Sequence, residues 1–278
     1  MSVYFTLNIK GALREFPTPV VMGIINVTPD SFYCNSRSAG ADDAVARAGC
    51  MLADGASILD VGGCSTRPGS EPVPEDVELE RAVPAVAAIR AHYPDAVISV
   101  DTFRGKVARK AIEAGADIIN DISGGTADPD ILRAAVELKV PYVLTHPAAS
   151  SLTPDTPLDQ TVSVVLLDLQ RTLRSLRQQG LCDVIIDPGF GFGKTLEQNY
   201  RLMAHLDAFS SLGCPVLVGV SRKSMITRVI DAAPHSSEAL TGTAVLNGYA
   251  LQHGAAILRV HDVSTAVETL KIINHLTV

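Results

Sequence analysis

The feature that most constrains the fold is a unit that recurs along nearly the whole chain. Each unit is a short apolar run that ends in a polar residue and is followed by a helical pattern. The clearest one ends at Asp187, where a glycine-rich turn leads to Lys194. Near-continuous apolar strands, each followed by a helix, are what a parallel sheet covered by helices requires. There are eight such units, with strands expected at Val20 to Asn26, Ile58 to Gly63, Ala96 to Asp101, Asp117 to Asp121, Tyr142 to His146, Asp183 to Asp187, Val216 to Ser221 and Ile257 to Asp262.

Eight units in one chain favour a closed (β/α)8 TIM barrel, of the α/β class, over an open doubly wound sheet. A length of 278 residues with 47% hydrophobic residues suits one such barrel. No low-complexity linker and no close repeat divides the sequence, so we expect residues 1–278 to form a single domain. The helices are expected at Asp42 to Ala53, Glu75 to Tyr93, Lys106 to Ala114, Asp130 to Lys139, Leu158 to Gln179, Leu196 to Leu212, Ala239 to His253 and Thr265 to Leu276.

In a TIM barrel the carboxyl ends of the strands meet at one rim, where active sites lie. One aspartate at a strand end is often only a helix cap or a turn former. Six of the eight expected strands, however, end in or lead directly to an Asp, Asn, Lys, Arg or His, and capping alone does not explain this repetition. The candidate rim residues are Asn26, Thr66, Arg67, Asp101, Asn120, Asp187, Lys223, Arg259 and His261.

The glycine-rich turn from Gly189 to Thr195 looks like a phosphate-binding P-loop, but it departs from that pattern. A Walker motif needs a glycine five residues before Gly193, and Pro188 occupies that position. We therefore interpret the glycines as a tight exit from the strand. Phosphate is expected instead at cations: Arg67 beside hydroxyl residues, and a patch of Arg222, Lys223, Arg259 and His261 after the last two strands.

Charge and composition limit the possible partners and the compartment. A net charge of -7 and a pI near 5.5 argue against nucleic acid and against an anionic membrane. The N-terminus lacks a signal peptide pattern, and no run approaches the roughly 18 apolar residues of a spanning helix, so we expect a cytoplasmic protein. The five cysteines form no Cys-x-x-Cys pair and are expected to be reduced thiols, with Cys64 lying among the candidate site residues.

Seven segments together closely resemble the dihydropteroate synthase family of the folate pathway. The resemblance runs from about Pro19 to Leu276 and keeps the order and spacing of the motifs. Several motifs at once are far more specific than any single one. The matching segments are Asn26 to Phe32, Asp60 to Gly69, Ser99 to Thr102, Ile119 to Ile122, Asp187 to Lys194, Ser221 to Ser224 and Arg259 to Val263.

The resemblance implies condensation of (7,8-dihydropterin-6-yl)methyl diphosphate with 4-aminobenzoate, a homodimer, a Mg²⁺ cofactor and competitive inhibition by sulfonamides. It implies that Asp101, Asn120, Asp187 and Lys223 hold the pterin, and that Asn26 contributes to the Mg²⁺ site. It further implies diphosphate binding by Arg67, Arg259 and His261, and a place near the substrates for Phe32, Thr66, Pro68, Phe192 and Ser224. The residues expected to act in catalysis are Asp101, Asp187, Lys223 and Arg67.

The residues are compatible with this chemistry. No serine or cysteine with a base partner stands out, so covalent catalysis is not indicated. Diphosphate can leave from the pterin methylene through a pterin cation, if cations neutralise the leaving group and carboxylates hold the ring. The aromatic amine then needs mainly positioning. The carboxylate of Asp187 suits the ring because it can accept two parallel hydrogen bonds from an aminopyrimidine edge.

Three segments depart from the family pattern. Tyr33 to Ser36 stands where the family usually has Ser-Asp-Gly-Gly, and Cys64 stands where it often has Glu. The fifth strand ends Thr145-His146-Pro147 instead of Met-His-Met, which removes an apolar contact with the pterin and could alter activity or sulfonamide response. Two alternatives follow: a pterin-dependent methyltransferase of the corrinoid type, and a non-catalytic pterin-binding paralogue.

Overall fold

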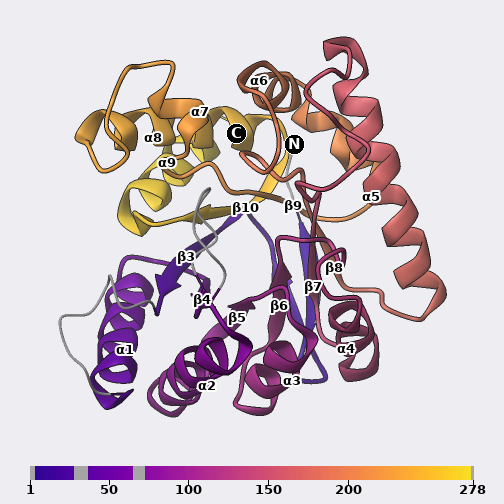
Figure 1. The fold of residues 1–278 in the computed structure, drawn as a ribbon. Helices are drawn as coiled ribbons and strands as arrows, with labels where there is room; N and C mark the ends of the chain where they lie inside the picture. Colours follow the sequence, from indigo (N-terminus) through magenta and orange to yellow (C-terminus); the bar gives the residue numbers. More distant parts are fainter. Residues whose placement is uncertain (1–3, 28–36, 65–72, 277–278) are drawn as a thin grey trace.

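Eight parallel strands close into a barrel in the order β10-β3-β4-β5-β6-β7-β8-β9, which confirms the predicted fold class. This architecture is seen in a computed structural model that describes residues 4–27, 37–64 and 73–276, and its helices surround the barrel (Figure 1). The barrel strands are β3 Val20–Asn26, β4 Ile58–Gly62, β5 Val97–Asp101, β6 Ile118–Asp121, β7 Tyr142–Thr145, β8 Val184–Asp187, β9 Val216–Val218 and β10 Ala255–Val260.

The helices follow the strands as expected, with three differences in the second half of the chain. The helix predicted from Leu158 to Gln179 begins with a separate 3-10 helix, Leu158–Gln160. The single helix predicted from Leu196 to Leu212 is broken at His205, and its second part is a 3-10 helix, Leu206–Leu212. A short helix, α7, was not predicted. The helices are α1 Arg37–Ala53, α2 Glu75–His92, α3 Gly105–Glu113, α4 Asp130–Leu138, α5 Thr161–Gln178, α6 Leu196–Ala204, α7 Ser224–Thr227, α8 Ser237–Gln252 and α9 Val263–Leu276.

Side chains of the barrel strands divide between two apolar clusters. Successive side chains of a strand point to opposite faces, so one set packs against the helices and the other fills the barrel. The inner cluster includes Ile118 of β6, Val143 of β7 and Ile185 of β8. Two residues further along these strands come Asn120, Thr145 and Asp187, which therefore also face the interior, close to the carboxyl rim.

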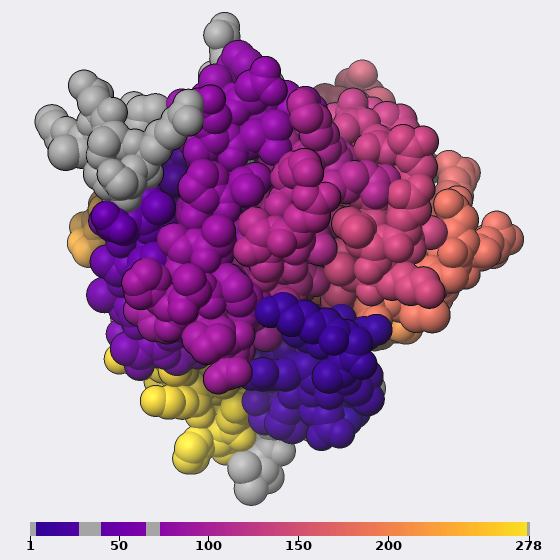
Figure 2. Space-filling model, turned by 90° about the horizontal axis from the view of Figure 1, so that it is seen from below, coloured from indigo at the N-terminus to yellow at the C-terminus, as the bar shows by residue number. Residues whose placement is uncertain are grey.

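An N-terminal hairpin that the sequence analysis did not predict closes the opposite end of the barrel. Its strands, β1 Phe5–Ile9 and β2 Ala12–Phe16, are joined by Lys10 and Gly11, with φ values of 55° and 82°. Positive φ at both residues is the geometry of a two-residue type I′ turn. Phe5 and Phe16 stack with their ring centroids 4.7 Å apart and pack into the inner cluster. Figure 2 shows the hairpin in indigo at the surface of the molecule.

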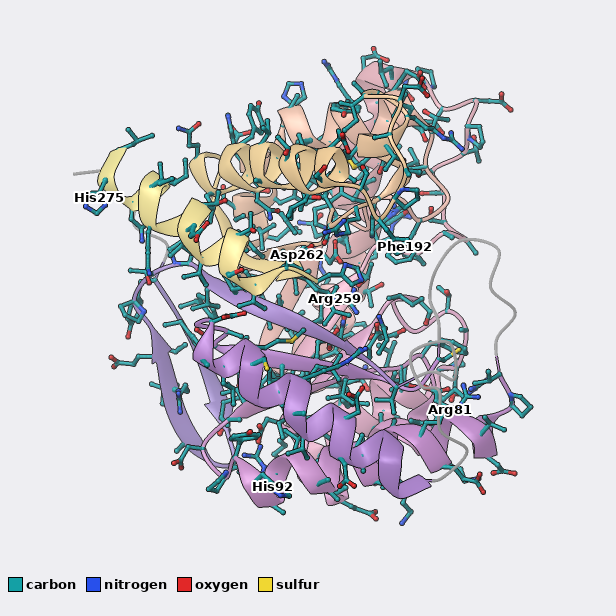
Figure 3. All side chains as sticks on the ribbon, turned by 90° about the vertical axis from the view of Figure 1, so that its left-hand side faces the viewer. Arg81, His92, Phe192, Arg259, Asp262 and His275 are labelled. Carbon is teal, nitrogen blue, oxygen red and sulfur yellow. The ribbon has the colours of Figure 1, made fainter. Side chains whose placement is uncertain are left out.

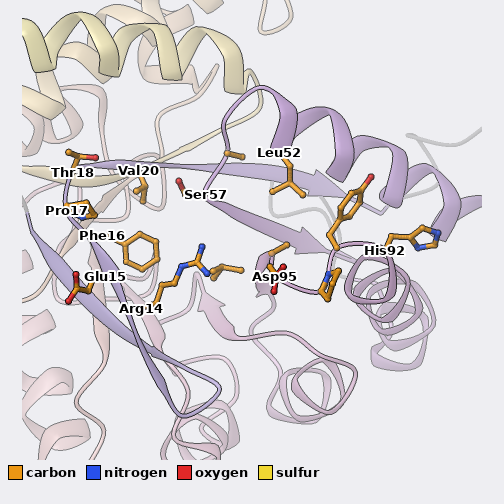
Figure 4. A pocket seen from close by; sticks show the side chains of 15 residues that line it. Arg14, Glu15, Phe16, Pro17, Thr18, Val20, Leu52, Ser57, His92 and Asp95 are labelled. Carbon is orange, nitrogen blue, oxygen red and sulfur yellow. The ribbon is translucent and has the colours of Figure 1, made fainter.

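A cavity of about 620 Å³ lies beside this hairpin and is lined by Arg14, Tyr93 and Asp95, among others (Figure 4). Its lining contains none of the predicted rim residues. Those predicted rim residues that the structure describes lie at the carboxyl ends of the strands, at the other end of the barrel. In the part of the chain that the structure describes, every helix is too short or too polar to cross a membrane.

Candidate active site

A network of buried charged side chains spans the interior of the barrel near the carboxyl rim. The Arg259 guanidinium of β10 donates from Nε to Asp60 Oδ2 at 2.7 Å and from Nη2 to Asp101 Oδ2 at 2.5 Å. Asn120 Nδ2 donates to the same Asp60 oxygen at 3.0 Å. Four strands thus contribute to one polar cluster, which joins two predicted pterin-binding residues to one predicted diphosphate-binding residue.

Asp187 and Lys223 form the second part of the site. Asp187 ends β8, and its Oδ1 accepts a hydrogen bond of 2.7 Å from the Gly189 N–H. Lys223 follows β9, and its Nζ donates to the Phe190 carbonyl at 2.5 Å and lies 4.2 Å from the centre of the Phe192 ring. Figure 3 labels Phe192, which contacts Lys223, and Arg259. The charges of Lys223 and Arg259 both act to lower the pKa of Asp187. The structure therefore brings these predicted site residues together.

Burial shifts the protonation equilibria of these groups toward neutral pH. Burial raises the pKa of Asp101 to about 7, with the Arg259 charge opposing the shift and the Asp60 charge adding to it. Burial also raises the pKa of Asp187, against the effect of the Lys223 charge. Burial lowers the pKa of Lys223 to about 8, although Asp187 acts to raise it. Such shifts cluster at functional sites, where a buried charge is maintained for binding or catalysis.

The turn after Asp187 is held by a buried lysine and by its own glycines. Lys194 Nζ donates to the carbonyls of Gly189 at 2.8 Å, Phe192 at 3.1 Å and His146 at 3.4 Å. Gly189 has a φ of +73°, and a Cβ there would lie 2.2 Å from the His146 oxygen. Glycine is required both for this backbone conformation and for the close approach of the two segments. Lys194 thus organises the turn.

The cationic patch predicted after the last two strands is only partly assembled. His261 Nδ1 lies 3.0 Å from Ser221 Oγ, which fixes the ring beside the rim. Arg222 instead makes a bidentate ion pair with Asp262, at 2.8 Å from Nε and 2.9 Å from Nη2. Arg222 therefore ties the segment after β9 to the segment after β10, and Lys223, Arg259 and His261 are the remaining residues of the predicted patch.

The sequence analysis did not select Asp60 as a site residue, although it is central to the network. It lies in the middle of β4 and not at a strand end, so the rule used for the other residues missed it. The sequence feature that could have identified Asp60 is a carboxylate inside an apolar strand, two residues after the inward-facing Ile58. Asp121 shows the opposite case: it ends β6 but accepts hydrogen bonds from the Tyr142 hydroxyl at 2.6 Å and from the Gly125 N–H at 2.7 Å, as a structural residue.

The remaining predicted residues divide into those near the rim and those outside the described chain. Asn26 ends β3 and is half-buried, while Ser224 begins α7 and is exposed. His146, which was not a predicted site residue, directly follows β7 and is buried with its Nε2 3.3 Å from Asp168 Oδ2, and burial lowers its pKa to about 4. Four predicted residues, Phe32, Thr66, Arg67 and Pro68, lie outside the described residues.

Comparison with known proteins identifies relatives along nearly the whole chain. The dihydropteroate synthase of Synechocystis sp. is 41% identical over 260 residues, which cover 91% of this chain and 88% of the relative. The structure of Xanthomonas albilineans dihydropteroate synthase with 4-aminobenzoic acid matches with a TM-score of 0.89 and 36% identity, covering 100% of this chain and 99% of the other. The Yersinia pestis dihydropteroate synthase in complex with a sulfonamide drug matches with a TM-score of 0.86 and 35% identity, covering 98% and 99%.

A match to a protein-family model agrees with the matches to these individual relatives. The sequence model described as "Pterin binding enzyme" matches residues 22–261, which include every barrel strand from β4 to β10 and most of β3. The matched range also contains Asp60, Asp101, Asp187, Lys223 and Arg259, the charged residues of the site described above. The chain therefore belongs to the pterin-binding enzyme family.

Proposed function

We propose that this protein is a dihydropteroate synthase, which condenses (7,8-dihydropterin-6-yl)methyl diphosphate with 4-aminobenzoate. The amine nitrogen forms a bond to the pterin methylene carbon, the carbon–oxygen bond to diphosphate breaks, and the amine loses a proton. The products are 7,8-dihydropteroate and diphosphate. The observation that carries the proposal is the buried assembly of carboxylates and cations at the carboxyl rim, found in a chain whose relatives carry this name.

The pterin is held by groups that retain hydrogen-bonding capacity inside the barrel. Asp101 Oδ1 is buried and has no hydrogen-bond partner within the described chain, while its other oxygen binds Arg259. Asp187 uses Oδ1 for the turn, which leaves the carboxylate fixed in orientation at the rim. Two anchored carboxylates can accept the N–H groups of an aminopyrimidine ring and favour positive charge on it. Asn120 and Lys223 complete this set, with Phe192 under the Lys223 ammonium.

The diphosphate is bound by the cations on the same rim. Arg259 lies within β10 and His261 directly follows this strand, and Ser221 orients the His261 ring. We assign Arg67 to the same role from the family resemblance. Asn26 offers an amide oxygen, a hard ligand that suits Mg²⁺, which typically takes few protein ligands and binds substrate phosphates. When bound there, Mg²⁺ would neutralise charge on the leaving diphosphate.

The 4-aminobenzoate binds on the outer side of the pterin. Ser224 is exposed at the start of α7, directly after Lys223, and therefore lies where a second substrate can enter. Phe32, Thr66 and Pro68 are assigned to this subsite from the family resemblance. A sulfonamide would compete for the same subsite, and one is the ligand of the Yersinia pestis relative.

Diphosphate release is the experiment that tests this function. The protein is mixed with (7,8-dihydropterin-6-yl)methyl diphosphate and Mg²⁺, and released diphosphate is measured with and without 4-aminobenzoate. Release that requires 4-aminobenzoate and is inhibited by a sulfonamide is the expected result. Binding of the pterin diphosphate without release would favour the non-catalytic paralogue, and methyl transfer from methyltetrahydrofolate would favour the methyltransferase.

A homodimer is the oligomeric state that we propose. Three large apolar side chains are exposed on two adjacent helices: Val245 on α8, and Ile272 and Leu276 on α9. They are 66%, 66% and 68% exposed, respectively, and an interface between two copies would cover them. The molar mass in solution tests this state directly.

We further propose that the protein acts in the cytoplasm on small molecules, without nucleic acid or membrane partners. The four cysteines that the structure describes, Cys50, Cys64, Cys182 and Cys214, are free thiols, as expected in a reducing compartment. The net charge of -7 disfavours both kinds of anionic partner.

A further inference from the structure

Thr145 has a buried hydroxyl group that the site as described does not use. It is the last residue of β7, its side chain is 0% exposed, and its Oγ1 has no hydrogen-bond partner among the described residues. Its side chain faces the barrel interior, since Val143, two residues earlier, belongs to the inner cluster. A buried hydroxyl without a partner is unfavourable, because it has lost its contact with water and gained nothing in return.

The neighbours of Thr145 are the residues assigned to the pterin. Its Cα pairs with that of Asp187 on β8, and parallel partners of this kind point to the same face of the sheet. On the other side, Asn120 of β6 pairs with Val143, one inward-facing position below Thr145. The hydroxyl therefore lies on the wall of the barrel mouth between two proposed pterin contacts.

We infer that the Thr145 hydroxyl forms a direct hydrogen bond with the bound pterin ring and thereby helps to set its position. The inference rests on the proposed function, because it names a further contact of the same pterin site. A hydroxyl can both donate and accept, whereas the carboxylates of Asp101 and Asp187 can only accept when ionised. Thr145 can thus serve an acceptor atom of the ring that these carboxylates leave unsatisfied.

Isothermal titration calorimetry with 7,8-dihydropteroate tests the inference in wild-type protein and three variants. Thr145→Val keeps the shape and removes the hydroxyl, and its dissociation constant should rise about fivefold, the usual effect of one neutral hydrogen bond. Thr145→Ser keeps the hydroxyl and should stay within about twofold of wild type. Ser99→Ala removes another fully buried hydroxyl without a partner in the described chain, two residues before Asp101 on β5, and should bind like wild type.

Urea denaturation of the ligand-free proteins supplies the second measurement. Thr145→Val should raise the midpoint, because it removes a buried polar group whose partner is the ligand. A lower midpoint would overturn the inference, since the hydroxyl would then have a partner within the protein. Unchanged affinity in Thr145→Val, or an equal loss of affinity in Ser99→Ala, would also overturn it. If wild-type protein does not bind 7,8-dihydropteroate at all, both the inference and the proposed function fail.

Discussion

At the scale of single residues, Asp60 binds Arg259 and adds to the effect of burial on the pKa of Asp101. Its carboxylate binds Arg259 at 2.7 Å, and its charge contributes to the raised pKa of Asp101, about 7. The proposed reaction requires Asp101 as a carboxylate and Lys223 as an ammonium. Activity should therefore rise through pH 7 as Asp101 ionises, and fall above pH 8 as Lys223, with a pKa of about 8, loses its proton.

The Asp60→Asn variant should move the acid limb of this profile to lower pH. Removal of the Asp60 charge removes a repulsion that raises the pKa of Asp101, while Arg259 keeps its own hydrogen bond from Nη2 to Asp101 Oδ2. The measurement is kcat/KM against pH, which reports groups of the free enzyme. Asp95→Asn makes the same charge change at the far end of the barrel and should leave the limb where it is. A limb that stays in place or moves to higher pH in Asp60→Asn would contradict this coupling.

The position of a residue at the site was predictable where a strand end and a chemical type coincided. Asn120 and Asp121 are adjacent at the end of β6 and look equally suitable in the sequence, yet Asn120 faces the interior and Asp121 binds Tyr142 outside it. The alternation of side chains separates the two, but only once the inward face is known. Asp60 was missed because it lies below the rim, where its role depends on a partner 199 residues away.

At the scale of elements, the turn after β8 positions Asp187 through a close backbone contact. Gly189→Ala would place a Cβ at a φ of +73° and 2.2 Å from the His146 oxygen, so the turn must move away from β7. We expect a loss of more than about 1 kcal/mol in unfolding free energy. The KM for the pterin substrate should also rise about tenfold, equivalent to ~1.4 kcal/mol, because the turn carries the N–H that orients Asp187.

Gly180→Ala is the matched control for this change. Gly180 has a similar φ of +89°, but a Cβ there would meet nothing within 4 Å. It should therefore lose stability through backbone strain alone and keep the KM of wild type. Urea denaturation and steady-state kinetics measure both effects, and an unchanged KM in Gly189→Ala would show that the turn does not position Asp187.

Elements were predictable where they are buried on both faces. The eight barrel strands are continuous apolar runs and were found within a few residues of their ends. Strand β2 was missed because four of its five residues are exposed, so it has no apolar pattern. The sequence feature that could have identified the hairpin is the pair Lys10-Gly11, which forms its tight turn. Helix α7 has only four residues, too few for a helical period to show.

At the scale of the whole molecule, closure of the barrel assembles the site. β10 pairs with β3, and this joins the last strand to the first and brings Arg259 within reach of Asp60 on β4. The count of eight strand-helix units predicted closure, but the register that brings these two side chains together follows from packing across the barrel. The hairpin fills the N-terminal end, and the network of Asp60, Asp101, Asn120 and Arg259 lies toward the carboxyl end.

The central claim is that this rim carries out the condensation, and the formation of 7,8-dihydropteroate by matched variants tests it most directly. Asp187→Asn removes the proposed pterin carboxylate, whereas Asp183→Asn makes the same change just before β8, at the opposite end of that strand. With isotopically labelled 4-aminobenzoate and mass spectrometry of the product, wild type and Asp183→Asn should form labelled dihydropteroate at similar rates. Asp187→Asn should lose about 30-fold in kcat/KM, or ~2 kcal/mol of transition-state stabilisation. Wild-type product formation by Asp187→Asn would contradict the account.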